Sequence, residues 1–487
     1  MFFFFSLLLL SLNSSAQYET SKWYFGNKSA LDFDRGRLNV LADSEMDAPA
    51  GSASICNDEG LLMFYSDGAT VWNRNHEIMT NGEGLAGDNN NFQSAIIIPK
   101  PGDDETYYLV YSRTEPSSTP LVTAGTFFSE IKFTNEDPLG IVSQKNNFLG
   151  EGSPSEKLTA VHHKSGESFW LVTLTGETSD NDLPKNIFKV YHITNEGFNT
   201  LPIKSISNVD IDHFGSMKLS VDGSKLLLSS NTLDDRVRYV RYFNFNNETG
   251  EINFNRSIII DPPPTSVWPP KGIEISPNGK FVYISFLTAN GAEGLFQYEI
   301  SNIEIGDDPR AMITFRNNII IESLQLANDQ KIYVALSQKD VDGTYLGVIQ
   351  YPNEKGLLTD YFSSAVNLDP GTSKRGLPNF IQSYFASKII TEDKCYVEEF
   401  SFASESYASI SDVVWDFGDG NIGTGINTTH TYNSPGEYTV KGVLTVGSKK
   451  VTVFKVVNAF ALPILTPNQE LTECDTDFDG LSTFNLN

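Results

Sequence analysis

One unit of sequence recurs along most of the chain: a polar turn followed by a strand-like run. It is clearest at 271–285, KGIEISPNGKFVYIS, where apolar and polar residues alternate on both sides of Asn278-Gly279. This period of two predicts a β-hairpin, and Asn-Gly suits the positive φ of a tight turn. Variants lie around Gly60, Gly102, Gly166, Gly223, Gly279 and Asp329, so that successive positions differ by 42, 64, 57, 56 and 50 residues. A lone hairpin cannot bury its apolar face, and repeats of this length with several strands each predict the blades of a β-propeller.

Further strand-like runs at 237–250, 294–302 and 345–353 predict the outer strands of such blades. Segments of helical period are missing between the units, which disfavours a parallel sheet with crossover helices. Six units are visible, and a seventh can be built from the two ends: 376–385 (GLPNFIQSYF) as an inner strand and 23–33 (WYFGNKSALDF) as its partners. We therefore predict an all-β chain with a seven-bladed propeller over 17–387, in preference to six or eight blades.

The pattern changes after Ser387. Strand runs at 413–425, 430–446 and 451–459 predict a small Ig-like β-sandwich over 388–460. Its most specific motif is Trp415-Asp416-Phe417-Gly418-Asp419-Gly420. Trp415 and Phe417 fall on one face and suit a core, Asp416 and Asp419 can accept hydrogen bonds from turn amides, and Gly418 and Gly420 allow a reversed backbone. We expect these six residues to be structural. With HTY at 430–432 and PGEYTV at 435–440, the motif closely resembles the PKD domain.

The net charge is −26, from 61 acidic and 35 basic residues. Such a charge repels nucleic acid and anionic membrane surfaces, so neither is expected as a partner. The opening MFFFFSLLLLSLNSSA has the apolar run and small residues of a signal peptide over 1–16, although no Lys or Arg precedes the run. The run is too short to span a membrane, and no other stretch is apolar and long enough. We expect export and a mature chain that begins at Gln17.

Several segments together resemble the N-terminal propeller-like region of large secreted surface proteins of Bacteroidetes. They are WYFG at 23–26, 53–79, QSAIIIPKPG at 93–102, EKLTAVHH at 156–163, GSMKLSVDGSKL at 215–226 and GLPNFIQSYF at 376–385. The resemblance implies PKD domains downstream and a type IX secretion sorting domain, often labelled gliding motility-associated, which this chain would lack. It further implies a place at the outer cell surface and the secretion machinery as a partner, and it names no ligand or activity.

The segment 461–487 reads as a linker and the start of a truncated repeat containing Cys and Asp. Asp475, Asp477 and Asp479, followed by Gly480, have the spacing by which a calcium loop places three side-chain oxygens. The twelfth loop position is Leu486 instead of Glu, so a bidentate ligand is missing, and a solvated acidic linker is the alternative. No other cofactor is expected. With only Cys56, Cys395 and Cys474, no disulfide framework is predicted; Cys395 and Cys474 are the pair to test.

Imidazole and carboxylate groups lie close in sequence at Asp210, Asp212 and His213, just before a predicted inner strand. Loops at this position face the centre of a propeller, so these three residues are the candidate ligand-binding group, with a structural role as the alternative. His162 and His163 are adjacent and would point to opposite faces of a strand, so they cannot share a metal ion. The chain contains no local motif of nucleophilic, metal-dependent or phosphate-binding catalysis.

These features favour an exported surface protein without catalytic activity, in which a propeller presents a face that binds glycan or protein and the PKD domain acts as a spacer. Two alternatives stay open: a propeller enzyme that acts on extracellular polysaccharide, and a purely structural module of an adhesion filament. Carboxylates that converge with His213 in a solvent-filled funnel would favour the enzyme.

Overall fold

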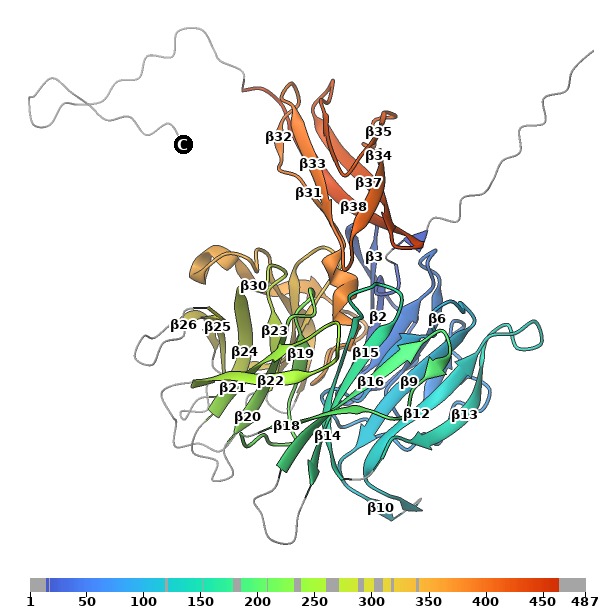
Figure 1. Ribbon diagram of the computed structural model, residues 1–487. Helices are drawn as coiled ribbons and strands as arrows, with labels where there is room; N and C mark the ends of the chain where they lie inside the picture. Colours follow the sequence, from blue (N-terminus) through green and yellow to red (C-terminus); the bar gives the residue numbers. More distant parts are fainter. Residues whose placement is uncertain are drawn as a thin grey trace, which may run out of the picture.

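The computed structural model describes residues 15–16, 18–118, 121–150, 152–177, 185–207, 209–231, 238–259, 271–287, 293–301, 310–316, 319–338 and 341–463. Their secondary structure is almost entirely β (Figure 1), which confirms the predicted class. The helical elements among these residues are two short 3-10 helices, η1 (Gly356–Thr359) and η2 (Gln382–Ala386).

From Lys22 to Asn367 the strands form a succession of antiparallel sheets, each made of strands that follow one another in the chain. The first two sheets contain β2 (Lys22–Phe25), β3 (Ser29–Asp34) and β4 (Arg37–Leu41), then β5 (Ala53–Cys56), β6 (Leu62–Ser66) and β7 (Val71–Asn73). The next contains β8 (Ala95–Pro99), β9 (Thr106–Arg113), β12 (Gly125–Lys132) and β13 (Ile141–Phe148), with the ribbon β10 (Ser117–Ser118) and β11 (Leu121–Val122) between β9 and β12. The fourth contains β14 (Ser153–His162), β15 (Phe169–Glu177) and β16 (Lys185–Thr194), and β16 also pairs with β17 (Gly197–Phe198) and β18 (Ile203–Ser207).

The remaining sheets of this part each have four strands. They contain β19 (Met217–Leu219), β20 (Lys225–Asn231), β21 (Arg238–Phe245) and β22 (Ile252–Ile259); β23 (Ile273–Ile275), β24 (Phe281–Leu287), β25 (Glu293–Glu299) and β26 (Arg310–Arg316); and β27 (Ile319–Leu326), β28 (Ile332–Gln338), β29 (Val341–Ile349) and β30 (Tyr361–Asn367).

The hairpin predicted at 271–285 is formed by β23 and β24. Ile273 lies opposite Ile284 in the register, and all three residues of β23 are buried. Gly279 has φ of +67°, and the Asn278 side chain accepts a hydrogen bond of 3.0 Å from the Lys280 amide. The turn residues therefore serve the turn itself.

The sheets form a closed, propeller-like ring (Figure 1). Their first strands contact one another in turn, from β2 to β5, β8, β14, β19, β23 and β27, and apolar clusters fill the spaces between neighbouring sheets. Trp23 of β2 packs edge-on against Tyr333 of β28, with ring centroids 5.5 Å apart. The first sheet thus packs against the last, as a propeller requires. The count of seven blades stays a prediction.

The prediction of an inner strand at 376–385 is wrong. The segment makes only isolated bridges, Ser52 with Pro378 and Ala160 with Ile381, and then continues as η2. It lies across first strands from different sheets: the Asn379 amide nitrogen donates to Ser52 O at 2.8 Å, and its Nδ2 donates to Leu158 O at 3.0 Å. Pro378 lacks an N–H for a ladder, and the first sheet consists of β2, β3 and β4 without this segment. The segment fills the centre of the ring instead.

The chain continues from Ser387 into a two-sheet sandwich. One sheet contains β31 (Lys388–Ile390), β33 (Phe400–Glu405) and β36 (Asn427–His430); the other contains β34 (Ile410–Asp416), β35 (Ile422–Thr424), β37 (Gly436–Val446) and β38 (Lys449–Phe460), with β32 (Lys394–Cys395) beside β38. β1 (Ser15–Ala16) also pairs with β38, in parallel, although it lies inside the expected signal peptide and would be absent from the mature chain.

The motif at 415–420 lies between the two sheets and in the turn after β34. Trp415 and Phe417 are fully buried in the sandwich core. Asp416 Oδ1 accepts a hydrogen bond of 2.9 Å from the Gly418 amide, and Asp419 Oδ1 accepts one of 3.0 Å from the Asn421 amide. Gly418 and Gly420 have φ of +80° and +90°. All of these contacts belong to the fold.

The sandwich stands on one end of the ring (Figure 1) and packs directly against it. His162, at the end of β14, stacks on Tyr407 of the sandwich with centroids 3.8 Å apart. Ser448 Oγ lies 3.1 Å and 3.0 Å from the two carboxylate oxygens of Glu167. The contact therefore lies on the face of the ring where the first strands end.

Candidate functional site

The predicted group Asp210, Asp212 and His213 lies at the opposite face, where the first strands begin. We call this region the ring mouth and define it by Phe92, Glu156, Asp212, Phe214 and Arg375. Lys157, which contacts Asp212, lies five positions before His162 at the sandwich contact, on the same strand β14. At about 3.3 Å per strand residue these two levels are roughly 17 Å apart.

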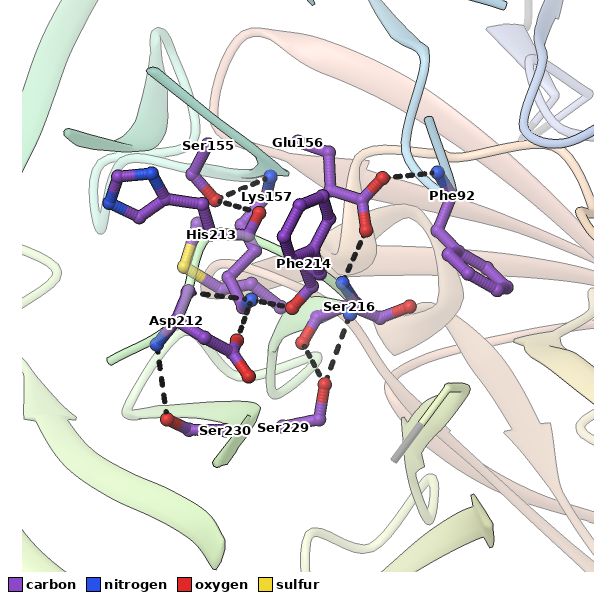
Figure 2. Close-up of polar contacts among 12 residues, drawn as sticks. Phe92, Ser155, Glu156, Lys157, Asp212, His213, Phe214, Ser216, Ser229 and Ser230 are labelled. Carbon is purple, nitrogen blue, oxygen red and sulfur yellow. Dashed lines mark hydrogen bonds and ion pairs between the residues drawn. The ribbon is translucent and has the colours of Figure 1, made fainter. Parts of the chain in front are cut away.

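Asp212 forms an ion pair with a buried lysine that the sequence analysis did not identify. Lys157 Nζ lies 3.0 Å from Asp212 Oδ1 and 3.0 Å from Asp212 O, and it also donates to Phe214 O (Figure 2). The Lys157 side chain is 0% exposed. An ammonium has three protons, and here each has an acceptor, which is the condition for burying the charge. Asp212 is therefore committed to holding the loop before β19.

Glu156, the preceding residue, connects two loops of the mouth. Its Oε2 accepts a hydrogen bond of 2.9 Å from the Phe92 amide, and its Oε1 accepts one from the Gly215 amide. Burial raises the pKa of Glu156, against the lowering effect of Lys157 and of these two amides. Both oxygens are occupied by backbone groups, so Glu156 positions the loops before β8 and β19.

His213 does not complete a catalytic group. Its carbonyl oxygen accepts hydrogen bonds from Ser155 Oγ at 2.8 Å and from the Glu156 amide at 3.1 Å, and Figure 2 shows its imidazole turned away from the Asp212 carboxylate. The imidazole of His213 lies against Gly176, where an added Cβ would be 2.8 Å from His213 Nε2. Burial lowers the pKa of His213, and nearby Lys157 lowers it further. The imidazole is therefore held toward its neutral form.

Asp210 contributes through its backbone, since its carbonyl oxygen accepts a hydrogen bond of 3.4 Å from Ser230 Oγ. The structure thus brings the three predicted residues into one loop without directing their ionisable groups at a common point. The convergence of carboxylates with His213 that would favour a polysaccharide-degrading enzyme is not found among the described residues.

Two exposed side chains at the mouth were missed by the sequence analysis. The Arg375 guanidinium lies 4.5 Å from the centroid of the Phe92 ring, and Phe214 is 55% exposed. Arg375 is also exposed, and its charge lowers the pKa of Glu156. The sequence signal for this region was the adjacent charged pair Glu156-Lys157 directly before the run Leu158 to Val161, because charged residues in a buried strand need partners from other segments.

A second polar network lies among the first strands themselves. Lys218 Nζ is 3.2 Å from Glu274 Oε2 and 2.5 Å from Gln325 Oε1, so it links β19, β23 and β27. The Glu274 oxygens also accept hydrogen bonds from the Ile275 and Leu326 amides. Lys218, Glu274 and Gln325 thus use one another and backbone amides as partners, and they tie three neighbouring first strands together.

His162 and His163 have separate partners, as expected: His162 Nδ1 lies 2.8 Å from Ser383 Oγ, whereas His163 Nδ1 lies 2.9 Å from Ser165 Oγ. In the part of the chain that the structure describes, no group of three His, Cys, Asp or Glu side chains is arranged to hold a metal ion. The proposed calcium ligands Asp475, Asp477 and Asp479 lie outside the described residues, as does Cys474. Cys56 and Cys395 are both free thiols.

Among the described residues, no helix is long and apolar enough to cross a membrane. Among protein families, the PKD domain matches residues 381–453. No curated protein matches the sequence.

Solved structures of several kinds share a remote likeness. A Bacteroides uniformis protein described as a 6-phosphogluconolactonase is 12% identical over 73% of this chain and 98% of its own, with a TM-score of 0.40. Hydrazine synthase from Kuenenia stuttgartiensis is 11% identical over 70% of this chain and 100% of its own, with a TM-score of 0.38. A Bombyx mori beta-fructofuranosidase is 11% identical over 75% and 86%, with a TM-score of 0.33. Scores this low carry no functional argument, and the comparisons identify the C-terminal sandwich alone, as a PKD domain.

Proposed function

We propose that the chain is an exported surface protein that binds glycan or protein at the ring mouth. In this proposal the ring is a seven-bladed propeller, and the protein is of the type IX secretion kind found in Bacteroidetes, with its sorting domain beyond this chain. The observation that carries the proposal is the position of the PKD domain. It covers the face where the first strands end, so the mouth faces away from the PKD domain.

The chemistry of the mouth suits recognition better than catalysis. Its buried ionisable groups, Glu156 and Lys157, are occupied by the protein's own amides, carbonyls and Asp212. Phe214 and Arg375 are exposed beside them. Aromatic and arginine side chains on a rigid support are typical of binding surfaces, because they bury much area and hydrogen-bond with little loss of conformational freedom.

The experiment is a glycan and matrix-protein binding array probed with the full chain, in calcium and in chelator. The variant Phe214→Ala/Arg375→Ala is compared with Leu201→Ala, a control whose parent side chain is 80% exposed in a loop outside the mouth. We expect at least one ligand whose binding weakens tenfold or more, roughly 1.4 kcal/mol, in the double variant alone.

Absence of any ligand on both panels would contradict the proposal. So would a ligand whose binding is unchanged in the double variant. Turnover of a polysaccharide without binding on the array would favour the enzyme alternative.

A further inference from the structure

We propose that a cavity between the ring and the PKD domain is a second binding site, for a neutral saccharide unit. We call it the junction cavity. It has a volume of about 400 Å³, within the range of small-molecule pockets. The residues that carry the argument are Glu19, Tyr107, Tyr384, Tyr407 and Lys449, contributed by both domains. The site is separate from the ring mouth and does not depend on the proposed function.

A buried polar atom without a partner lines this cavity. Glu19 Oε2 is buried and has no hydrogen-bond partner. Tyr107, Tyr384 and Tyr407 also line the cavity, and their hydroxyls can donate or accept a hydrogen bond. Buried polar groups in folded proteins are nearly always paired, with protein, ligand or ordered water. The unpartnered carboxylate oxygen of Glu19 therefore indicates that something outside the protein supplies its partner.

These four residues line the same cavity. The pKa of Tyr384 is raised first by burial and then by Glu19, Tyr407 and Tyr107, and the Glu19 charge also raises the pKa of Tyr107 and Tyr407. We call Glu19 and these three tyrosines the cluster.

The cluster is held rigidly. His162 stacks on Tyr407 at 3.8 Å and lies edge-on to Tyr384 at 5.3 Å. Its Nδ1 is 2.8 Å from Ser383 Oγ, in the segment that fills the ring centre. Because the phenol groups of Tyr384 and Tyr407 both pack on His162, their hydroxyl ends are fixed before a ligand arrives. Preorganised polar groups lose little entropy on binding.

The charges on the cavity wall balance. Above about pH 7, where Glu19 is ionised, Glu19, Asp58 and Asp104 supply three negative charges, and Lys100, Lys449 and Lys450 supply three positive ones, so the sum is zero. A cation or an anion would meet like charges on part of the wall. A neutral ligand avoids that cost. Sugar hydroxyls both donate and accept, which matches a wall that offers a carboxylate acceptor, an ammonium donor and phenols that can do either.

The test uses the purified full chain and titration calorimetry with a panel of neutral sugars: glucose, galactose, mannose, maltose and cellobiose. Galacturonate serves as the anionic comparison. The test variant is Tyr384→Phe/Tyr407→Phe, which keeps the rings and removes two hydroxyls. The control is Tyr438→Phe, whose hydroxyl donates to Ser434 O within the PKD domain at 2.9 Å.

We expect at least one neutral sugar to bind, more tightly than galacturonate. Each lost hydrogen bond weakens binding by roughly fivefold, so the double variant should lose tenfold or more while the control is unchanged. Glu19→Gln, which keeps the side-chain shape, should weaken the same sugar and guards against misfolding of the double variant.

Two results would overturn the inference. One is the absence of binding by all five neutral sugars, which would leave the cavity to ordered water. The other is binding that survives in the Tyr384→Phe/Tyr407→Phe protein. If that binding is instead lost in Phe214→Ala/Arg375→Ala, the sugar belongs to the ring mouth, and the proposed function stands without the junction cavity.

Discussion

The imidazole of His162 stacks on the phenol ring of Tyr407 with centroids 3.8 Å apart and planes 4° apart. The two residues belong to different domains, the ring and the PKD sandwich, and both pack beside the segment that fills the ring centre. This contact joins three parts of the chain that are far apart in sequence. It holds the PKD domain directly against one face of the ring, as a cap.

Tyr407→Ala should weaken this cap. Removing the phenol group of Tyr407 exposes His162 and leaves a space where the two side chains stacked, so we expect a loss of about 1–3 kcal/mol in the free energy of unfolding. Tyr407→Phe keeps the stack and should be nearly neutral. Urea denaturation followed by Trp fluorescence measures both variants. Equal stability of the Ala and Phe variants would show that the stack contributes little.

Glu19 should make the protein less stable as pH rises from acid to neutral. Burial raises the pKa of Glu19 to about 7 from 4.5, so the folded state prefers the protonated form. The free energy of unfolding is not reduced by Glu19 below about pH 4.5, because the carboxyl is protonated in both states. The reduction grows as pH rises to about 7 and is then constant, at roughly 3 kcal/mol at most.

Glu19→Gln removes this penalty, so the variant should be more stable than the parent at pH 8 and equal to it at pH 4.5. Melting temperatures of the two proteins across this range provide the measurement. The two proteins must be compared with each other because His162 has the opposite effect on stability. Burial lowers the pKa of His162 well below its usual value, so the folded protein loses stability as pH falls below about 6.5. A pH-independent difference would contradict the assignment.

Asp212→Ala should destabilise the ring mouth. It removes one partner of the buried Lys157 ammonium and leaves two backbone carbonyls, so we expect a cost of about 2 kcal/mol or more. The double variant Lys157→Met/Asp212→Asn removes the buried charge as well and should recover part of the loss. Chemical denaturation of the two variants tests this order. A double variant less stable than Asp212→Ala would argue against it.

Asn379→Ala tests the segment in the ring centre. Asn379 Nδ2 donates to Leu158 O at 3.0 Å, and Gln93 Nε2 lies 3.4 Å from Asn379 Oδ1, all in buried surroundings. Loss of these bonds leaves a buried carbonyl unpaired, at a cost of about 2 kcal/mol. Asn90→Ala, an exposed residue outside the segment, is the matched control. Similar stability of the two variants would mean that the segment is not held by Asn379.

Local patterns predicted much of the fold because they describe local physics. The alternation at 271–285 set the two strands and their buried faces, and Asn278-Gly279 set their turn. The motif at 415–420 carried enough information to identify a PKD domain before any comparison. The segment 376–385 had the same apolar character as the inner strands, but it meets the edges of the first strands only at single bridges, and its Pro378 cannot donate to a ladder, so the same pattern led to a wrong prediction there.

The candidate site could not be predicted in the same way. Asp212 and His213 are adjacent in sequence, yet Lys157, 55 positions away, decides what Asp212 does. Glu19 and Tyr407 looked unremarkable, because their role depends on where the PKD domain rests on the ring. Sequence by itself determined strand period, turn chemistry, charge and the class of each domain, since these follow from residues near one another in the chain. Tertiary structure alone decided the closure of the ring, the filling of its centre and the junction cavity, because those depend on which distant groups satisfy one another's hydrogen bonds.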